Sequence, residues 1–164
     1  MRTLSNLQLQ KLAELYHASP TSGIVRLEPN VAKAHPTAAV YATPDKELAL
    51  SMASPEASDD NISVNYYTDL STNKKSNLHI DELKPGAFRR AYNRPAYLYK
   101  VPKEHFQTHP DLMAEEVISE VPVETLEEEK IENILQYLLE AHKKGLINLN
   151  DYDSVLDSMK ERTT

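Results

Sequence analysis

The sequence predicts an α+β protein that folds as a single domain over residues 1–164. Short apolar runs between residue 20 and about residue 123 are separated by proline, asparagine and aspartate, a pattern typical of strands joined by loops. After residue 124 the spacing of apolar residues changes to that of a helix. The 164 residues, of which 40% are hydrophobic, suffice for one modest core.

The first predicted element is a helix over residues 5–14. Ser5 and Gln8 have the spacing of a capping box, and leucines follow at helical intervals. The helix must end before Pro20. The sequence therefore predicts an N-terminal helix in front of the strands.

Four apolar runs predict strands: "VYAT" (40–43), "NISVNYYT" (61–68), "AYLYKVP" (96–102) and "EVISEVPV" (116–123). In the second, Ile62 and Val64 alternate with polar residues, as in a half-buried strand. Pro122 is expected to divide the last run or to place it at a sheet edge.

The segments between these strands are predicted from their composition. "PDKELALSMA" (44–53) has proline and two acids in its first turn, which predicts a short helix. Residues 54–60 and 70–86 are polar and contain proline, so we expect loops there.

Residues 124–164 are predicted to form a C-terminal helical pair. Thr125 and Glu128 form a capping box, which predicts a helix over 126–144 that ends at Gly145. Its apolar stripe consists of Ile131, Ile134, Leu135, Leu138 and Leu139. A last helix is expected from about Asn150. The stripe indicates packing on the sheet, on a protein partner or on a second copy of the chain.

Composition excludes several classes of protein. A net charge of −7 argues against nucleic acid as the main partner, because neutralising phosphates needs a basic surface. The three glycines are too far apart for a dinucleotide-binding or P-loop motif, and there is no cysteine. We expect no membrane contact and a cytoplasmic location, since no apolar run approaches the length of a bilayer span or a signal core.

Other reactive side chains give weaker patterns. The six histidines are scattered without metal-ligand spacing, so no metal site is expected, and no GxSxG motif marks a nucleophilic serine. The segment "KPGAFRRAYNRP" gathers four basic residues around two aromatic ones: Lys84, Arg89, Arg90, Arg94, Phe88 and Tyr92. It is either a solvated loop or an anion-binding segment.

Four phrases carry a resemblance to known proteins: "LYHASP", "VYATPDKELALSMA", "AYLYKVPKEHF" and "EEVISEVPV". In this order they resemble a group of uncharacterised bacterial and phage proteins that is similar to the ADP-ribosyltransferase superfamily. The resemblance covers residues 15–123. It implies a split antiparallel β-sheet core that binds NAD, as substrate, between a histidine strand, an aromatic strand and a glutamate strand.

The resemblance implies a role for five residues. His17 would hold a ribose hydroxyl of NAD, and the backbone of Ala18, where the resembling group has glycine, would bind the nicotinamide amide. Tyr41 and Thr43 would shape the nicotinamide pocket. Glu116 would stabilise the positive charge that develops on the ribose as its bond to nicotinamide breaks. The implied function is an NAD-dependent mono-ADP-ribosyltransferase, or an NAD-cleaving relative, with an unspecified acceptor.

Each of these residues also has a structural interpretation. His17 can be a hydrogen-bonded residue at a strand end, Tyr41 a core aromatic and Glu116 a solvent-facing acid. Glu115 and Glu120 are rival acids, since a shift of one residue selects the other face of a strand. The alternative function is a non-catalytic phage or mobile-element protein of the same fold that binds a protein partner through its C-terminal helix.

Overall fold

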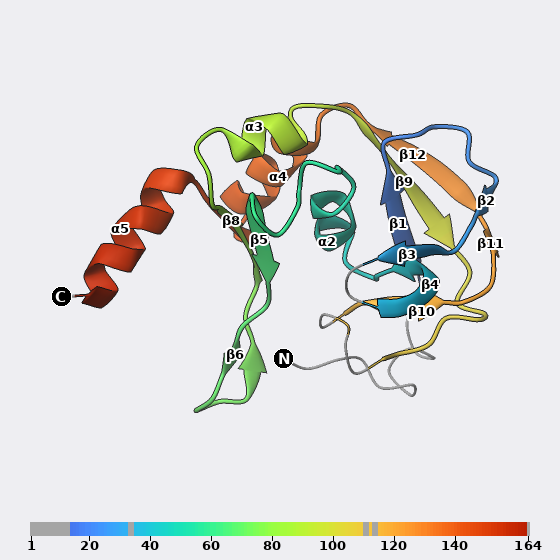
Figure 1. Cartoon of the computed structure of the whole chain (residues 1–164), viewed down its shortest axis with the longest axis horizontal. Coiled ribbons are helices and arrows are strands. Elements are labelled where there is room, and N and C mark those ends of the chain that lie inside the picture. The colour runs from blue at the N-terminus through green and yellow to red at the C-terminus, as the bar shows by residue number, and fades with distance from the viewer. Residues whose placement is uncertain (1–13, 33–34, 110–111, 113–114, 164) are drawn as a thin grey trace.

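A computed structural model describes residues 14–32, 35–109, 112 and 115–163. Over these residues the fold is α+β, with four helices and several mostly antiparallel sheets (Figure 1). Apart from Glu14, the helix expected at 5–14 lies outside the described residues.

The first sheet has the order β1-β9-β12 and is antiparallel throughout: β1 (Leu15–Ser19), β9 (Ala96–Val101) and β12 (Glu127–Ile131). The strand predicted from "AYLYKVP" is confirmed as its central strand. Ala96 and Leu98 belong to the larger hydrophobic core, whereas Leu15 and Val101 belong to a second core on the opposite face. This sheet therefore separates the two cores.

The second sheet has the order β10-β4-β3: β3 (Asn30–Ala32), β4 (His35–Ala42) and β10 (Val117–Ser119). The strand predicted at 40–43 is confirmed for 40–42, with Thr43 in a bridge. Beyond Pro122 the chain forms a separate strand that pairs with another short one: β11 (Val123–Glu124) and β2 (Arg26–Leu27). Pro122 thus divides the run, as expected.

One backbone bridge joins the first two sheets. The Tyr16 N–H donates to the Thr43 carbonyl at 2.8 Å, and the Thr43 N–H donates to the Tyr16 carbonyl at 3.0 Å. No other pairing between β1 and β4 exists among the described residues. The two strands therefore separate beyond this bridge.

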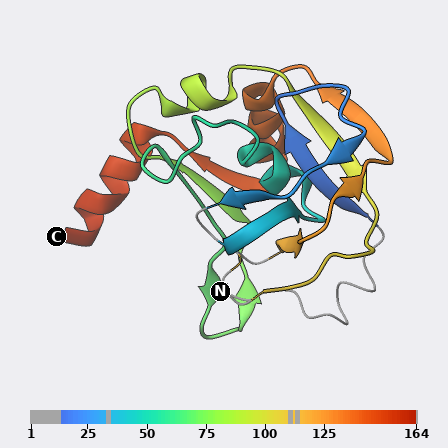
Figure 2. The ribbon, with the colours of Figure 1, turned by 45° about the vertical axis from the view of Figure 1, so that its right-hand side comes forward.

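The third sheet contradicts the expected loop at 70–86. Its order is β13-β8-β5, with β13 parallel to β8: β5 (Ile62–Asn65), β8 (Leu78–Glu82) and β13 (Ile147–Asn150). Within β8, Leu78, Ile80 and Glu82 are buried and alternate with more exposed residues. Flanking charges hide this alternation in the sequence. A hairpin projects below this sheet in Figures 1 and 2: β6 (Thr68–Asp69) and β7 (Lys74–Lys75).

Two predicted helices are confirmed, and a third was not predicted: α2 (Lys46–Ser51), α5 (Tyr152–Thr163) and α3 (Ala87–Tyr92). Asp45 caps α2, because its Oδ1 accepts the N–H groups of Glu47 and Leu48 at 3.0 and 3.2 Å. The α3 helix lies in the segment interpreted above as either a solvated loop or an anion-binding segment. It forms because Phe88 and Tyr92 are buried in the larger core. The α5 helix projects from the body of the molecule (Figure 1).

The predicted start of the long C-terminal helix at residue 126 is wrong. Strand β12 occupies residues 127–131, and the helix begins after Asn133, whose side chain accepts the Gln136 N–H at 3.0 Å: α4 (Ile134–Lys143). Ile134 and Leu138 lie in the larger core, between α4 and the third sheet. Ile134 and Leu138 of the apolar stripe thus pack inside the chain, whereas Leu139 is exposed. The helix ends before Gly145, as expected.

The larger core fills the space among the third sheet, the central strand β9 and helices α2, α3 and α4. Its largest fully buried side chain is Tyr92, whose hydroxyl donates to the Ser51 carbonyl at 2.9 Å. The second core lies among β1, β2, β4, β10 and β11. Among the described helices, none has the length and apolar character to cross a membrane.

Candidate functional site

His17 lies in the middle of β1, opposite Tyr99 of β9. Its Nδ1 is 2.7 Å from the carbonyl oxygen of Tyr41. A carbonyl only accepts, so Nδ1 carries the proton and Nε2 of the neutral ring remains an acceptor. Burial lowers the pKa of His17 below 6.5, more than this hydrogen bond raises it. His17 is therefore neutral at pH 7.

An open pocket of about 390 Å³ lies beside His17. Six of its lining residues bring polar or charged groups: His17, Ser19, Arg26, Glu28, Asn30 and Tyr41. The remaining wall is apolar: Ile24, Leu27, Ala39 and Val40. A concavity that combines an apolar wall with polar groups is a candidate small-molecule site.

Strand β1 presents a free backbone edge next to this pocket. Tyr16 uses both its backbone groups on Thr43, so two residues later Ala18 directs its N–H and C=O toward the same edge. Lys100, the β9 partner of Tyr16, supports this register. Its carbonyl accepts the Leu126 N–H on the β12 side and therefore does not face β1. No described strand pairs with Ala18 on the free edge.

Glu116 lies on the other side of β4. It is 7% exposed and directly precedes β10. Ile118 exchanges both backbone hydrogen bonds with Gln107, at 2.8 and 2.9 Å, so the backbone groups of its β4 partner Tyr41 face away from β10 and toward His17. Strand β4 therefore runs between the His17 ring and Glu116.

Tyr41, on β4, is a neighbour of both His17 and Glu116. Its carbonyl holds His17, while its side chain packs on Ala39 and Ile118. Its hydroxyl is buried and has no hydrogen-bond partner among the described residues. Burial, and next the charge of Glu116, raise the pKa of Tyr41 above 10.0. The phenol is thus protonated and keeps an unused donor close to an acid.

The two rival acids differ from Glu116 in their surroundings. Glu120 is exposed, beyond the end of β10. Glu115 is half-buried with a backbone φ of 72°, and its charge is among the causes that raise the pKa of Tyr66. Of the three, Glu116 is the most buried.

The five residues singled out in the sequence thus fall into three groups. His17 and Tyr41 line the pocket, and Ala18 lies on the adjacent free edge. Thr43 is buried, and its hydroxyl accepts the Asp45 N–H at 3.1 Å, so it supports the start of α2. Glu116 lies across β4. Sequence reasoning missed the pocket wall at 24–30, which carries no motif.

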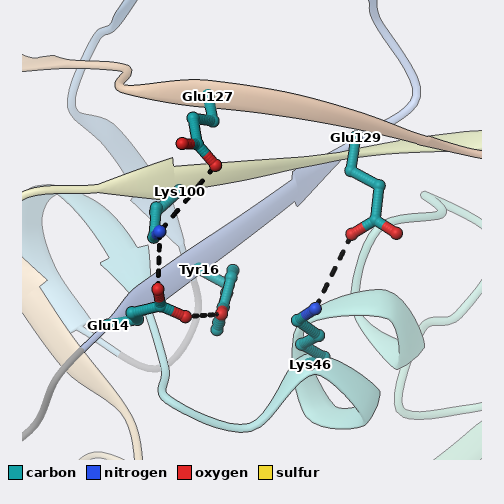
Figure 3. Close-up of polar contacts among 6 residues, drawn as sticks. All are labelled: Glu14, Tyr16, Lys46, Lys100, Glu127 and Glu129. Atoms are coloured by element: carbon teal, nitrogen blue, oxygen red, sulfur yellow. Dashed lines mark hydrogen bonds and ion pairs between the residues drawn. The ribbon is translucent and has the colours of Figure 1, made fainter.

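Six charged or phenolic side chains bind β1 to its neighbours beside this site (Figure 3): Glu14, Tyr16, Lys46, Lys100, Glu127 and Glu129. Lys100 pairs with carboxylates from both sides, and the Tyr16 hydroxyl donates to Glu14. Lys46 lies 5.1 Å from the centre of the Tyr16 ring and 3.7 Å from the Glu129 carboxylate. Burial, and next Glu14, raise the pKa of Tyr16 to about 12, so the phenol stays a donor. These contacts fix β1 against β9, β12 and α2.

The loop that leads from β1 to the pocket wall is tied to β9 and β12. The Tyr99 hydroxyl accepts the Ile24 N–H at 3.2 Å and shares its proton between the Thr21 carbonyl, at 2.6 Å, and Glu128, at 2.8 Å. The same Glu128 oxygen accepts the Gly23 N–H at 2.6 Å. Tyr99 and Glu128 therefore hold the loop that brings Ile24 into the pocket.

We expect Tyr99→Phe to lower the free energy of unfolding by about 1 kcal/mol, because it removes one hydroxyl that serves three partners. Urea denaturation followed by circular dichroism measures this loss. Tyr97→Phe is the matched control, since Tyr97 is half-buried on the same strand and does not hold this loop. Equal stability of the two variants would contradict the role given to the Tyr99 hydroxyl.

Two carboxyl groups interact at the start of α2. The Glu47 carboxyl hydrogen-bonds to that of Asp45, which also accepts the Tyr66 hydroxyl through Oδ2. Burial, and next Asp45, raise the pKa of Glu47 from 4.5 to about 7. Protonated Glu47 can donate to Asp45, whereas two carboxylates repel each other.

This pair makes stability depend on pH. Because the pKa of Glu47 is raised on folding, its contribution is fully present below pH 4.5 and is lost as the pH rises through about 7. We expect Glu47→Gln to match the wild type at pH 4.5 and to exceed it at pH 8 by about 1 kcal/mol, a figure reduced for solvent screening. Melting temperatures of both proteins at the two pH values test this. A constant difference between them would contradict it.

No protein-family model, curated protein or solved structure matches the chain. Within the part of the chain that the structure describes, no three histidine, aspartate or glutamate side chains form a group that could hold a metal ion. The candidate site therefore rests on its own geometry: a neutral histidine, the adjacent free strand edge and the pocket beside the histidine.

Proposed function

We propose that the chain binds NAD in the pocket beside His17 and acts as an NAD-dependent mono-ADP-ribosyltransferase or NAD-cleaving relative, with a split-sheet core of that superfamily's kind. The observation that carries the proposal is the free edge of β1 at Ala18, next to the neutral ring of His17. The bridge at Tyr16 and Thr43, beyond which two sheets separate, supports the split-sheet part.

The free edge suits a carboxamide. Ala18 offers one N–H donor and one C=O acceptor, and a carboxamide has the complementary oxygen and NH₂ group. The amide of nicotinamide would therefore bind as a neighbouring strand does. Nε2 of His17 would accept a hydrogen bond from a ribose hydroxyl, which positions the sugar without proton transfer.

Catalysis requires a carboxylate at the ribose. Bond cleavage leaves positive charge on the sugar, and a fixed carboxylate stabilises that charge more in the transition state than in the ground state. Glu116 precedes β10, the strand next to β4, and neighbouring strands lie about 4.8 Å apart. The nicotinamide ribose is joined directly to the ring placed at Ala18, so it would have to extend across β4 toward Glu116 for this carboxylate to act.

Titration calorimetry with millimolar NAD tests binding. We expect heat of binding and a rise in melting temperature for the wild type. His17→Ala should weaken binding about tenfold, since it removes one hydrogen bond to a buried ring. An absence of both heat and melting shift in the wild type would overturn the proposal.

A second measurement separates catalysis from binding. Glu116→Gln should abolish NAD cleavage, followed as release of nicotinamide, while the fold and NAD affinity persist. Glu120→Gln is the matched control, because Glu120 is exposed at the other end of the same strand. If Glu116→Gln cleaves NAD like the wild type, Glu116 has no catalytic role. If the wild type binds NAD without cleaving it, the catalytic part of the proposal is wrong.

A further inference from the structure

We propose that Arg26 and Glu28 form a phosphate subsite of the pocket, in which Arg26 binds a phosphate group of the ligand and Glu28 is the competitor that the phosphate displaces. This proposal rests on the proposed function in one respect: the identity of the whole ligand, NAD, is taken from it. The two side chains form an ion pair at the pocket, with 3.0 Å between Arg26 Nε and Glu28 Oε1.

Arg26 is the only lysine or arginine among the residues that line the described pocket, and Glu28 is its only carboxylate. A guanidinium offers a planar fork of donors that matches two phosphate oxygens, and its charge persists at every relevant pH. An anionic group that enters this pocket therefore has one cation to bind. The apolar wall and the amide of Asn30 provide no other positive charge.

The ion pair is easy to open. The side chains of Arg26 and Glu28 are 58% and 63% exposed, so water compensates much of the attraction between them. Glu124 lies opposite Arg26 in the β2–β11 pair and is a second nearby acid. With one cation between two acids, the free subsite carries a net negative charge. A phosphate must therefore displace Glu28, which lowers affinity and selects for ligands that also bind at His17.

The geometry of β2 supports a fixed position for Arg26. Leu27, the next residue, is buried in the second core and pairs with Val123 of β11. The backbone of Arg26 is thus anchored while its side chain points away from that core, because successive residues of a strand face opposite sides. The pocket volume of about 390 Å³ exceeds the needs of one phosphate ion, so the phosphate is expected as part of a larger ligand.

Calorimetry with three probes tests the subsite: ADP-ribose, inorganic pyrophosphate and nicotinamide riboside, which lacks a phosphate. Arg26→Gln should weaken ADP-ribose about tenfold and leave nicotinamide riboside unchanged, whereas Glu28→Gln should strengthen ADP-ribose about threefold. Raising the salt concentration should weaken ADP-ribose in the wild type more than in Arg26→Gln. Lys144→Gln, at an exposed lysine where α4 ends, is the control.

The outcomes separate this inference from the proposed function. If Arg26→Gln binds ADP-ribose as tightly as the wild type and the Lys144→Gln control, the subsite is refuted, even if NAD is bound and cleaved. If pyrophosphate binds the wild type but not Arg26→Gln, the subsite is confirmed, even if nicotinamide riboside does not bind and NAD is not cleaved. If Arg26→Gln loses affinity equally for all three probes, the substitution disturbs the fold rather than a phosphate contact. This result would overturn the subsite.

Discussion

Replacing Glu82 with alanine is expected to lower the free energy of unfolding by about 3 kcal/mol, because its carboxylate supports two helices at once. Glu82 is 7% exposed at the end of β8. One oxygen accepts the Phe88 N–H at 2.8 Å, in the first turn of α3, and the other accepts the Tyr152 N–H at 2.9 Å, at the start of α5. Without the carboxylate, both N–H groups lose their acceptor.

Urea denaturation measures this loss, and two further variants give its cause. Glu82→Gln keeps one acceptor oxygen and should lose about 2 kcal/mol. Glu104→Ala, at an exposed acid, should stay within about 0.5 kcal/mol of the wild type. Hydrogen exchange at the Tyr152 amide should accelerate in Glu82→Ala. Slow exchange together with unchanged stability would refute the capping role.

The elements that could be predicted from the sequence are those specified by their own residues. Helix α2 has its cap, Asp45, and its first-turn acid, Glu47, next to the apolar residues that it buries. Strand β9 lies between Pro95 and Pro102 and alternates between the two cores. In both, local signals and tertiary packing agree, so the pattern was sufficient.

The errors arose where pairing with distant residues decides the structure. Residues 127–131 contain three glutamates in a row, which suits the first turn of a helix, yet they pair with β9 at the sheet edge. Charges on an edge strand also limit pairing with other chains. In β8, Asp81 and Glu82 made a central strand look like a loop, although Glu82 is buried as a cap rather than solvated.

The candidate site was only partly accessible from the sequence. His17 and Tyr41 were reached through a resemblance, and no residue pattern predicts that the Tyr41 carbonyl fixes the tautomer of His17. The pocket wall at 24–30 carries no motif. Its position depends on contacts such as that between Gly23 and Glu128, 105 residues apart, which only the folded chain brings together.

Leu138→Ala should lower the free energy of unfolding by about 3 kcal/mol, since it removes a fully buried side chain from the larger core. Leu139→Ala, on the next residue of α4 and 37% exposed, should cost about 1 kcal/mol or less. Urea denaturation of both variants measures the contrast. It tests whether the apolar stripe of α4 is part of the core or a surface for a partner.

The same pair of variants decides the non-catalytic alternative, which assigned this stripe to a protein partner or a second copy. A docking stripe would tolerate Leu138→Ala in the isolated chain, and the variant would instead weaken association in sedimentation experiments. The structure places Leu138 with Ile134 and Ile147 inside the chain, so we expect lost stability and an unchanged sedimentation coefficient for the folded variant. If Leu138→Ala keeps its stability but loses association, the stripe is a docking surface, which favours a binding role.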